Sequence, residues 1–229
     1  MTREMDMNDT TIDYADFAEY DRRQRGIERH LVAAFLGGLA VGLIGMLISG
    51  NGPGWLGQIY DPYAYLALSL TVGATASGFG WALVTTFLAA VSTLVSAMGA
   101  SALTGDEAFD VIGGSPAGLN WTLGLLVGLG LLAYATRRQD GWGDVAAGAV
   151  GAALIADVVD RATPGFIDSD QSFWPGPAMV VGLASVALVP VLRRSRRGRV
   201  RALGMSAVFA GLFTVCLAAF VAGWIPLAV

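Results

Sequence analysis

Lysine is absent from this chain of 229 residues, and histidine and cysteine occur once each. Without lysine, neither a Schiff base, such as the one that holds retinal, nor a phosphate-binding P-loop can form. A single cysteine, Cys216, excludes an internal disulfide and a thiolate metal cluster. A single histidine, His30, excludes haem and zinc sites built on histidine pairs. The sequence therefore predicts no cofactor and no metal site.

Charge is also scarce, because only 14% of the residues are charged whereas 55% are hydrophobic. A water-soluble domain needs about a quarter of its residues charged. The mean hydropathy of +0.60 excludes a disordered chain and a soluble enzyme of ordinary composition. The chain also lacks room for a basic domain with stacking aromatic residues, so nucleic acid is not an expected partner. The composition predicts an all-α membrane protein.

Seven apolar runs can be distinguished, each near the ~20 helical residues that cross a hydrocarbon core of ~30 Å. The sequence thus predicts a seven-transmembrane-helix bundle over residues 31–229. Residues 77–81 lie in a long stretch without charge, where they could form a surface turn or a re-entrant element. The predicted spans are 31–49, 63–79, 81–104, 118–136, 145–160, 176–192 and 202–227.

The arginines predict the orientation of these spans through the positive-inside rule. If residues 63–104 cross the membrane twice, Arg161 alone among the 14 arginines lies outside. A single crossing would instead move Arg137, Arg138 and the run 193–201 to the outer side. We therefore expect the N-terminus in the cytoplasm, the C-terminus outside, and the protein in the plasma (inner) membrane. The oligomeric state is left open.

Residues 1–30 form a tail in which acidic residues precede arginines, an order that suits a helix dipole. The apolar residues Tyr14, Phe17 and Ile27 fall loosely on one side of a helix. The sequence predicts an amphipathic helix lying along the inner membrane surface. Its charged face is either solvated or a docking site for a protein partner.

Two glycine pairs have the spacing of helix-packing motifs. Gly38 lies four residues before Gly42, and Gly124 lies four residues before Gly128. Residues four apart share one helix face, and glycine lets a neighbouring backbone approach closely. Both pairs are therefore predicted to pack helices within the bundle.

Asp157 is the acidic residue that this topology places inside the membrane, about 20 Å along the fifth span from Asp144. Such an acid normally faces a cavity or a partner. Asp160 lies on nearly the same face, and Asn120 has a similar depth in the adjacent fourth span. The sequence predicts that Asp157, Asn120 and Asp160 line a path for a substrate or ion. In the alternative, the fifth span ends near Ala156 and both aspartates lie among the lipid headgroups.

The sequence Gly141-Trp142-Gly143-Asp144 resembles the second-aspartate motif of intramembrane aspartyl proteases. That chemistry needs a first aspartate at the same depth, and no earlier span supplies one. The motif is therefore interpreted as an inner turn with an N-cap. A serine nucleophile would also lack a histidine or lysine base in the membrane. We expect no enzymatic activity.

A run of six arginines in nine residues precedes the seventh span. Beside a bilayer such charges contact anionic lipid heads, each with about 1 kcal/mol of attraction. They could equally contact a cytoplasmic protein. The run comprises Arg193, Arg194, Arg196, Arg197, Arg199 and Arg201.

Two functions fit these features. The first is a small permease or channel-like transporter of a cation or small solute, with the polar site at Asp157. The second is a non-catalytic membrane subunit or scaffold of a larger complex, for instance the membrane partner of a separate ATPase. In that alternative, residues 1–30 and the arginine run would bind the partner.

Overall fold

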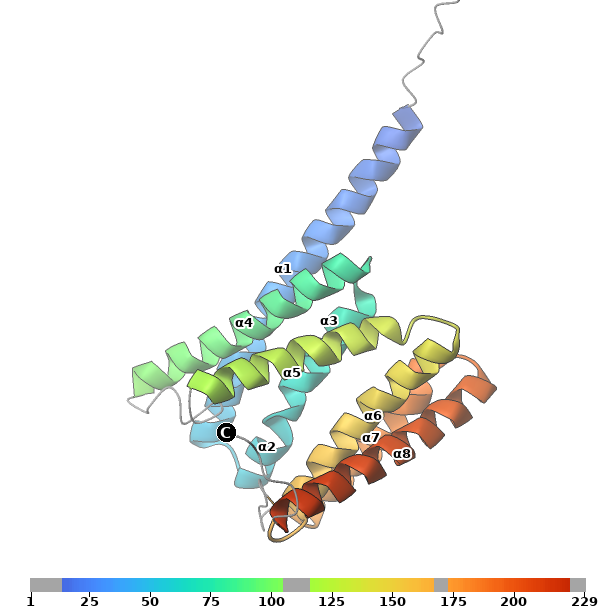
Figure 1. Cartoon of the computed structure of the whole chain (residues 1–229). Helices are drawn as coiled ribbons and strands as arrows, with labels where there is room; N and C mark the ends of the chain where they lie inside the picture. The colour runs from blue at the N-terminus through green and yellow to red at the C-terminus, as the bar shows by residue number, and fades with distance from the viewer. Residues whose placement is uncertain (1–13, 105–115, 167–172, 223–229) are drawn as a thin grey trace, which may run out of the picture.

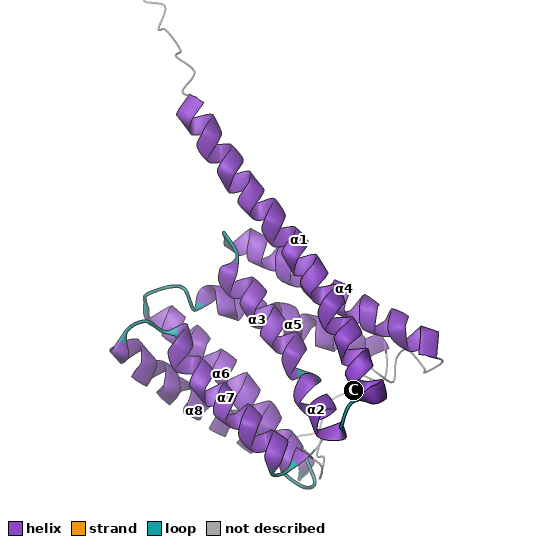
Figure 2. Cartoon of the chain, turned by 180° about the vertical axis from the view of Figure 1, so that it is seen from behind, coloured by secondary structure: helices purple, strands orange, loops and turns teal. Residues whose placement is uncertain are grey.

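A computed structural model describes residues 14–104, 116–166 and 173–222, and these ranges contain helices and no strand (Figures 1 and 2). The apolar runs of the sequence account for most of the helices. The helices of the described ranges are α1 (Tyr14–Asn51), α2 (Gly54–Tyr60), α3 (Tyr63–Thr75), α4 (Phe79–Thr104), α5 (Pro116–Ala135), α6 (Gly141–Ala162), α7 (Gly176–Leu192) and α8 (Arg196–Val221).

Within the described ranges, five helices are long and apolar enough to cross a membrane, namely α1, α4, α5, α6 and α8. Helix α7 is apolar but has 17 residues, and α3 has 13. The expected all-helical protein with several helices able to span a membrane is thus confirmed. The bounds of α7 match the predicted run 176–192, whereas α3 ends four residues before the predicted limit of its span.

The helices pack in two groups. In one group, α4 and α5 pack together, α3 packs against both, and α1 packs against α3 and α4. In the other, α6, α7 and α8 contact one another. The groups meet where α5 contacts α6 and where the short α2 contacts α7 (Figures 1 and 2). Helix α6 therefore lies at the junction between the groups.

Helix α1 differs from the sequence prediction. The expected separate helix along the membrane surface is not formed, because residues 14–51 make one continuous helix of 38 residues. No proline interrupts this stretch, so the helix propagates from the charged segment into the apolar one. Its N-terminal part projects beyond the other helices (Figure 1). Residues 1–13 of the predicted tail lie outside the described ranges.

The uncharged stretch 63–104 forms two helices joined by a short turn. Helix α3 ends at Thr75, α4 begins at Phe79, and the two helices pack against each other. The side chain of Arg137 donates a hydrogen bond to the carbonyl of Ala76 in this turn. The ring of Phe79 meets that of Tyr134 edge to face. Contacts from the end of α5 thus hold the turn in place.

Glycines set the closest helix contacts. A Cβ added at Gly38 would lie 1.9 Å from Ser92 Oγ, and one at Gly42 would lie 2.0 Å from Ser96 Oγ. The prediction for this pair is confirmed, because it packs α1 against α4. By contrast, a Cβ at Gly124 or Gly128 would meet open space. This second pair therefore makes no close packing contact within the described part of the chain.

Candidate functional site

Helix α6 carries one ion-paired aspartate near each end. Asp144 belongs to the first turn, and Asp157 lies thirteen residues further on. At ~1.5 Å per residue, about 20 Å separates the two along the helix axis. The two sites differ in burial, in partners and in the space beside them.

The cluster at the C-terminal end of α6 consists of Asp157, Tyr63 and Arg161. The Tyr63 hydroxyl donates to Asp157 Oδ2 at 2.5 Å, and Arg161 Nε lies 3.2 Å from the same oxygen. Arg161 follows Asp157 by one helical turn, which brings the two side chains together. Both are partly exposed, with 30% of the Asp157 side chain and 26% of the Arg161 side chain accessible. The aspartate is thus paired without being enclosed.

Tyr63 is the first residue of α3, and its ring is held by the segment that precedes α7. Its ring stacks on Phe173, with centroids 6.3 Å apart and ring planes inclined by 18°. Phe173 is itself buried beside Ala178 and Val181 of α7. This packing fixes the tyrosine hydroxyl that reaches Asp157.

A second carboxylate adds to the charge of this cluster. Asp61, between α2 and α3, lies close enough to interact electrostatically with both Asp157 and Arg161. Asp160, one turn after Asp157, is partly buried on α6. Asp61 and Asp157 therefore both interact with the single guanidinium of Arg161, and negative charge is in excess.

A cavity of about 450 Å³ opens beside the cluster, between α5, α6 and α8. Asp157 and Asp160 are its charged lining residues. The remaining lining is apolar and consists of Trp121, Leu125, Ala149, Ala152, Ala153, Ala156, Phe209 and Phe213. The structure therefore brings two of the three predicted path residues to one cavity.

The third predicted residue, Asn120, is exposed on α5, next to the cavity residue Trp121. The structure pairs Asp157 with Tyr63 and Arg161 rather than with Asn120. Sequence reasoning missed Tyr63. Its position directly after Pro62, at the start of a predicted span, was the signal that could have placed it at the depth of Asp157.

The cluster at the N-terminal end of α6 is built around a buried ion pair. Arg193 Nη2 lies 2.5 Å from Asp144 Oδ1, and only 2% and 6% of the two side chains are exposed. Arg193 Nη1 donates to the carbonyls of Thr136, at 2.8 Å, and Arg138, at 2.6 Å. Arg201 Nη1 lies 3.8 Å from the other Asp144 oxygen. The pair therefore joins the loop after α5 to the starts of α6 and α8.

Two helix caps and two glycines surround this pair. Asp140 caps α6 by accepting from the Gly143 N–H, and Ser195 caps α8 by accepting from the Gly198 N–H. A Cβ at Gly143 would lie 2.0 Å from the Arg138 carbonyl oxygen. The expected cap of the Gly-rich turn is present, and Asp140 provides it. Asp144 is the partner of Arg193.

Arg193 differs from the arginines with which the sequence groups it. It is buried and points to Asp144, so it is not a contact for lipid heads or a partner. The other five arginines of the run are exposed, and they are Arg194, Arg196, Arg197, Arg199 and Arg201.

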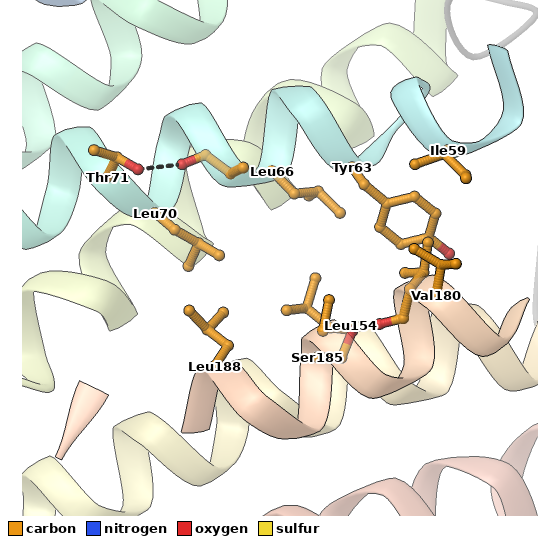
Figure 3. Close-up of a pocket in the computed structure, with 12 residues that line it drawn as sticks. Ile59, Tyr63, Leu66, Leu70, Thr71, Leu154, Val180, Ser185 and Leu188 are labelled. Carbon is orange, nitrogen blue, oxygen red and sulfur yellow. Dashed lines mark hydrogen bonds between the residues drawn. The ribbon is translucent and has the colours of Figure 1, made fainter. Parts of the chain in front are cut away.

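A second cavity, of about 320 Å³, lies between the two helix groups (Figure 3). Tyr63 lies at one end of it, and Leu70 and Leu188 lie at the other. The hydroxyl groups of Thr71 and Ser185 donate to carbonyls of their own helices, those of Ala67 and Val181, and the Tyr63 hydroxyl donates to Asp157. This cavity is therefore an apolar space without a polar group directed at a ligand.

No protein family model, no curated protein and no solved structure matches the chain. Among the described residues, no group of three or more histidine, cysteine, aspartate or glutamate side chains could hold a metal ion. The chemistry of the α5–α6–α8 cavity is thus the main guide to function. Its excess of carboxylate charge and its apolar walls suit a cationic ligand.

Proposed function

We propose that the protein is a permease of the plasma membrane that moves a cation or a small solute through a bundle of seven spans. The spans would be α1, α3, α4, α5, α6, α7 and α8, with α2 extending the short α3 at its N-terminal end. With a cytoplasmic N-terminus, this arrangement leaves Arg161 as the one arginine on the outer side. The Asp144 cluster would then be cytoplasmic and the Asp157 cluster close to the outer surface.

The observation that carries this proposal is the pairing of Asp157 beside a cavity. An ionised carboxylate within a membrane is costly and is retained where it faces a partner or a ligand path. Asp157 has both a partner, Arg161, and the cavity that it lines. The excess of carboxylates over arginine at this end favours cations over anions.

Transport is tested with the purified protein in liposomes that carry a gradient of Na⁺, K⁺, H⁺ or an organic cation, tetraethylammonium. We expect wild-type flux of at least one of these ions, and loss of that flux in Asp157→Asn. Asp21→Asn is the matched control, because Asp21 is an exposed residue in the N-terminal part of α1, a helix that does not line the cavity. Equal flux in wild type and Asp157→Asn, or no flux of any of these ions, would contradict the proposal.

The topology is tested separately by labelling single cysteines in cells. The exposed native Cys216 is first replaced by serine. A cysteine at Gln139, between α5 and α6, is expected to be protected from an impermeant reagent, whereas one at Thr163, after α6, is expected to react. The reverse pattern would invert the proposed orientation.

A second function, that of a membrane subunit, is favoured by the projecting N-terminal part of α1. Its residues 19–22 and 24–29 are largely exposed and carry charges of both signs. We expect a stoichiometric second protein after extraction in a mild detergent, detected by native mass spectrometry, and its loss when residues 1–20 are deleted. A chain that travels alone would argue against this second function.

A further inference from the structure

The shape of the α5–α6–α8 cavity is that of a groove with one charged end. The α6 residues that line it recur every three or four positions along the helix, so they share one helix face. Four are alanines, at positions 149, 152, 153 and 156, and the two that follow are Asp157 and Asp160. From Ala149 to Asp160 this face extends about 16 Å along the helix.

The side walls of the groove are larger and largely aromatic. Trp121 and Leu125 come from α5, and Phe209 and Phe213 come from α8. Trp121 and Phe213 are exposed, and α5 and α8 do not pack closely against each other, so the groove opens sideways between these two helices. The alanines leave the space that the aromatic residues border. A ligand could therefore enter from the side of the bundle.

The charge of the groove is confined to one end. Asp157 and Asp160 lie at that end, whereas the walls provide apolar surface. Apolar walls cannot replace the hydration shell of a bare metal ion. They do favour an organic cation, because aromatic rings attract cations and apolar surface gains from burial.

We propose that this groove binds an amphiphilic organic monocation, an ammonium or phosphonium group with an apolar body. The cationic centre lies at Asp160 and Asp157, and the apolar body lies along the alanine face towards Ala149. This inference rests on the proposed function, since it names the substrate class of the same site. Binding of such a cation requires both the carboxylates at one end of the groove and the empty volume along the alanines.

Binding is measured with radiolabelled tetraphenylphosphonium and the full chain in nanodiscs of phosphatidylcholine. We expect saturable binding at one site per chain, weakened about tenfold or more in Asp160→Asn. Asp21→Asn is the control and should bind as wild type does. Because the nanodiscs have the same composition, uptake of the probe by lipid cancels in each comparison. Non-saturable binding, or equal affinity in Asp160→Asn, would overturn the proposal.

The volume of the groove is tested with Ala153→Phe, since Ala153 is an exposed part of its wall. We expect this variant to lose tetraphenylphosphonium binding. Ala207→Phe, on an exposed face of α8 that does not line the groove, adds the same side chain and should bind normally. Normal binding by Ala153→Phe, with an unchanged elution volume, would overturn the assignment of the site.

Burial of the apolar body along the alanine face is tested by competition with alkyltrimethylammonium ions of increasing chain length. Each added methylene should strengthen competition about fourfold until the groove is filled. Alkyl alcohols of the same length should compete weakly, and equal competition by them would show that a lipid chain, not a cation, occupies the groove.

The two proposals fail in different ways. Saturable tetraphenylphosphonium binding without flux of Na⁺, K⁺, H⁺ or tetraethylammonium would remove the permease and retain the cation site. Flux of Na⁺, K⁺ or H⁺ without tetraphenylphosphonium binding would retain the permease and remove the organic cation as its substrate.

Discussion

The two ends of α6 use the same pair of residue types for different purposes. At the N-terminal end, Asp144 and Arg193 are almost fully buried, and two backbone carbonyls accept from Arg193 Nη1. At the C-terminal end, Asp157 and Arg161 are partly exposed beside a cavity. An enclosed ion pair with all its geometry fixed is suited to joining helices. A partly open pair with excess negative charge is suited to exchanging partners.

The largest expected loss of stability comes from breaking the buried ion pair of Asp144 and Arg193. Arg193→Met leaves Asp144 buried without its partner and should destabilise the protein by about 3–5 kcal/mol. Arg161→Met breaks the partly exposed pair and should cost no more than about 1 kcal/mol. Apparent melting temperatures in detergent, followed by tryptophan fluorescence, compare the two variants.

The double variant Asp144→Leu/Arg193→Met is the control for this comparison. It removes both charges and should recover most of the stability lost in Arg193→Met, because no unpaired buried charge remains. Equal losses in Arg193→Met and Arg161→Met would show that the two ends of α6 do not differ as we infer.

A smaller loss of stability is expected when a side chain is added at Gly143, where the Arg138 carbonyl comes close to the helix backbone. Gly143→Ala places a methyl group against the Arg138 carbonyl, and the resulting shift should cost about 1–3 kcal/mol. Gly182→Ala, on α7 near the other end of α6, meets only Val158 at an ordinary 3.8 Å and should be neutral or stabilising. Melting temperatures of the two variants give the comparison, and a stable Gly143→Ala would contradict it.

At the C-terminal end of α6, Tyr63→Phe removes one hydrogen bond to Asp157 and leaves the stacked ring in place. We expect a loss of about 1–2 kcal/mol, because the acceptor is charged but Arg161 still pairs with it. The melting temperature tests this value. A loss as large as that of Arg193→Met would mean that the C-terminal cluster is structural as well.

The smallest effect concerns the exposed pair of Arg138 and Asp140. The hydrogen bond from Arg138 lowers the pKa of the Asp140 carboxyl, and the Gly143 N–H acts in the same direction. A lowered pKa adds stability above the ordinary Asp range, and this is lost as the pH falls through the lowered value. Asp140→Asn should therefore melt slightly below wild type at pH 7, and the difference should narrow near pH 3. A difference independent of pH would contradict this reasoning.

Hydropathy was enough to predict most of the helical elements, because each apolar run had to satisfy its backbone internally. It did not predict α2, which lies between two of the predicted spans. It was enough for α7, whose bounds agree with the sequence. For residues 77–81 it left a surface turn and a re-entrant element open, and the arginine distribution favoured two crossings. Hydropathy failed for α1, because amphipathic character does not reveal whether a charged segment bends away from the span that follows it.

The partners of the charged residues were harder to predict. Arg193 and Asp144 are 49 positions apart, and nothing in a run of six arginines marks the one that turns inward. The neighbouring Gly143 and Gly198 allow the close approach, but glycine is common throughout this chain. Asp157 was identified because its cost in a membrane is large. Its partner Tyr63 depends on how α3 packs, which the sequence does not show.

The continuity of α1 has a mechanical consequence. A helix of 38 residues is about 57 Å long, nearly twice the thickness of the hydrocarbon core. Its membrane part is fastened to α4 at Gly38 and Gly42, whereas its other end is free of the bundle. A tilt of α1 by a few degrees about these glycines would therefore displace its free end by several ångströms.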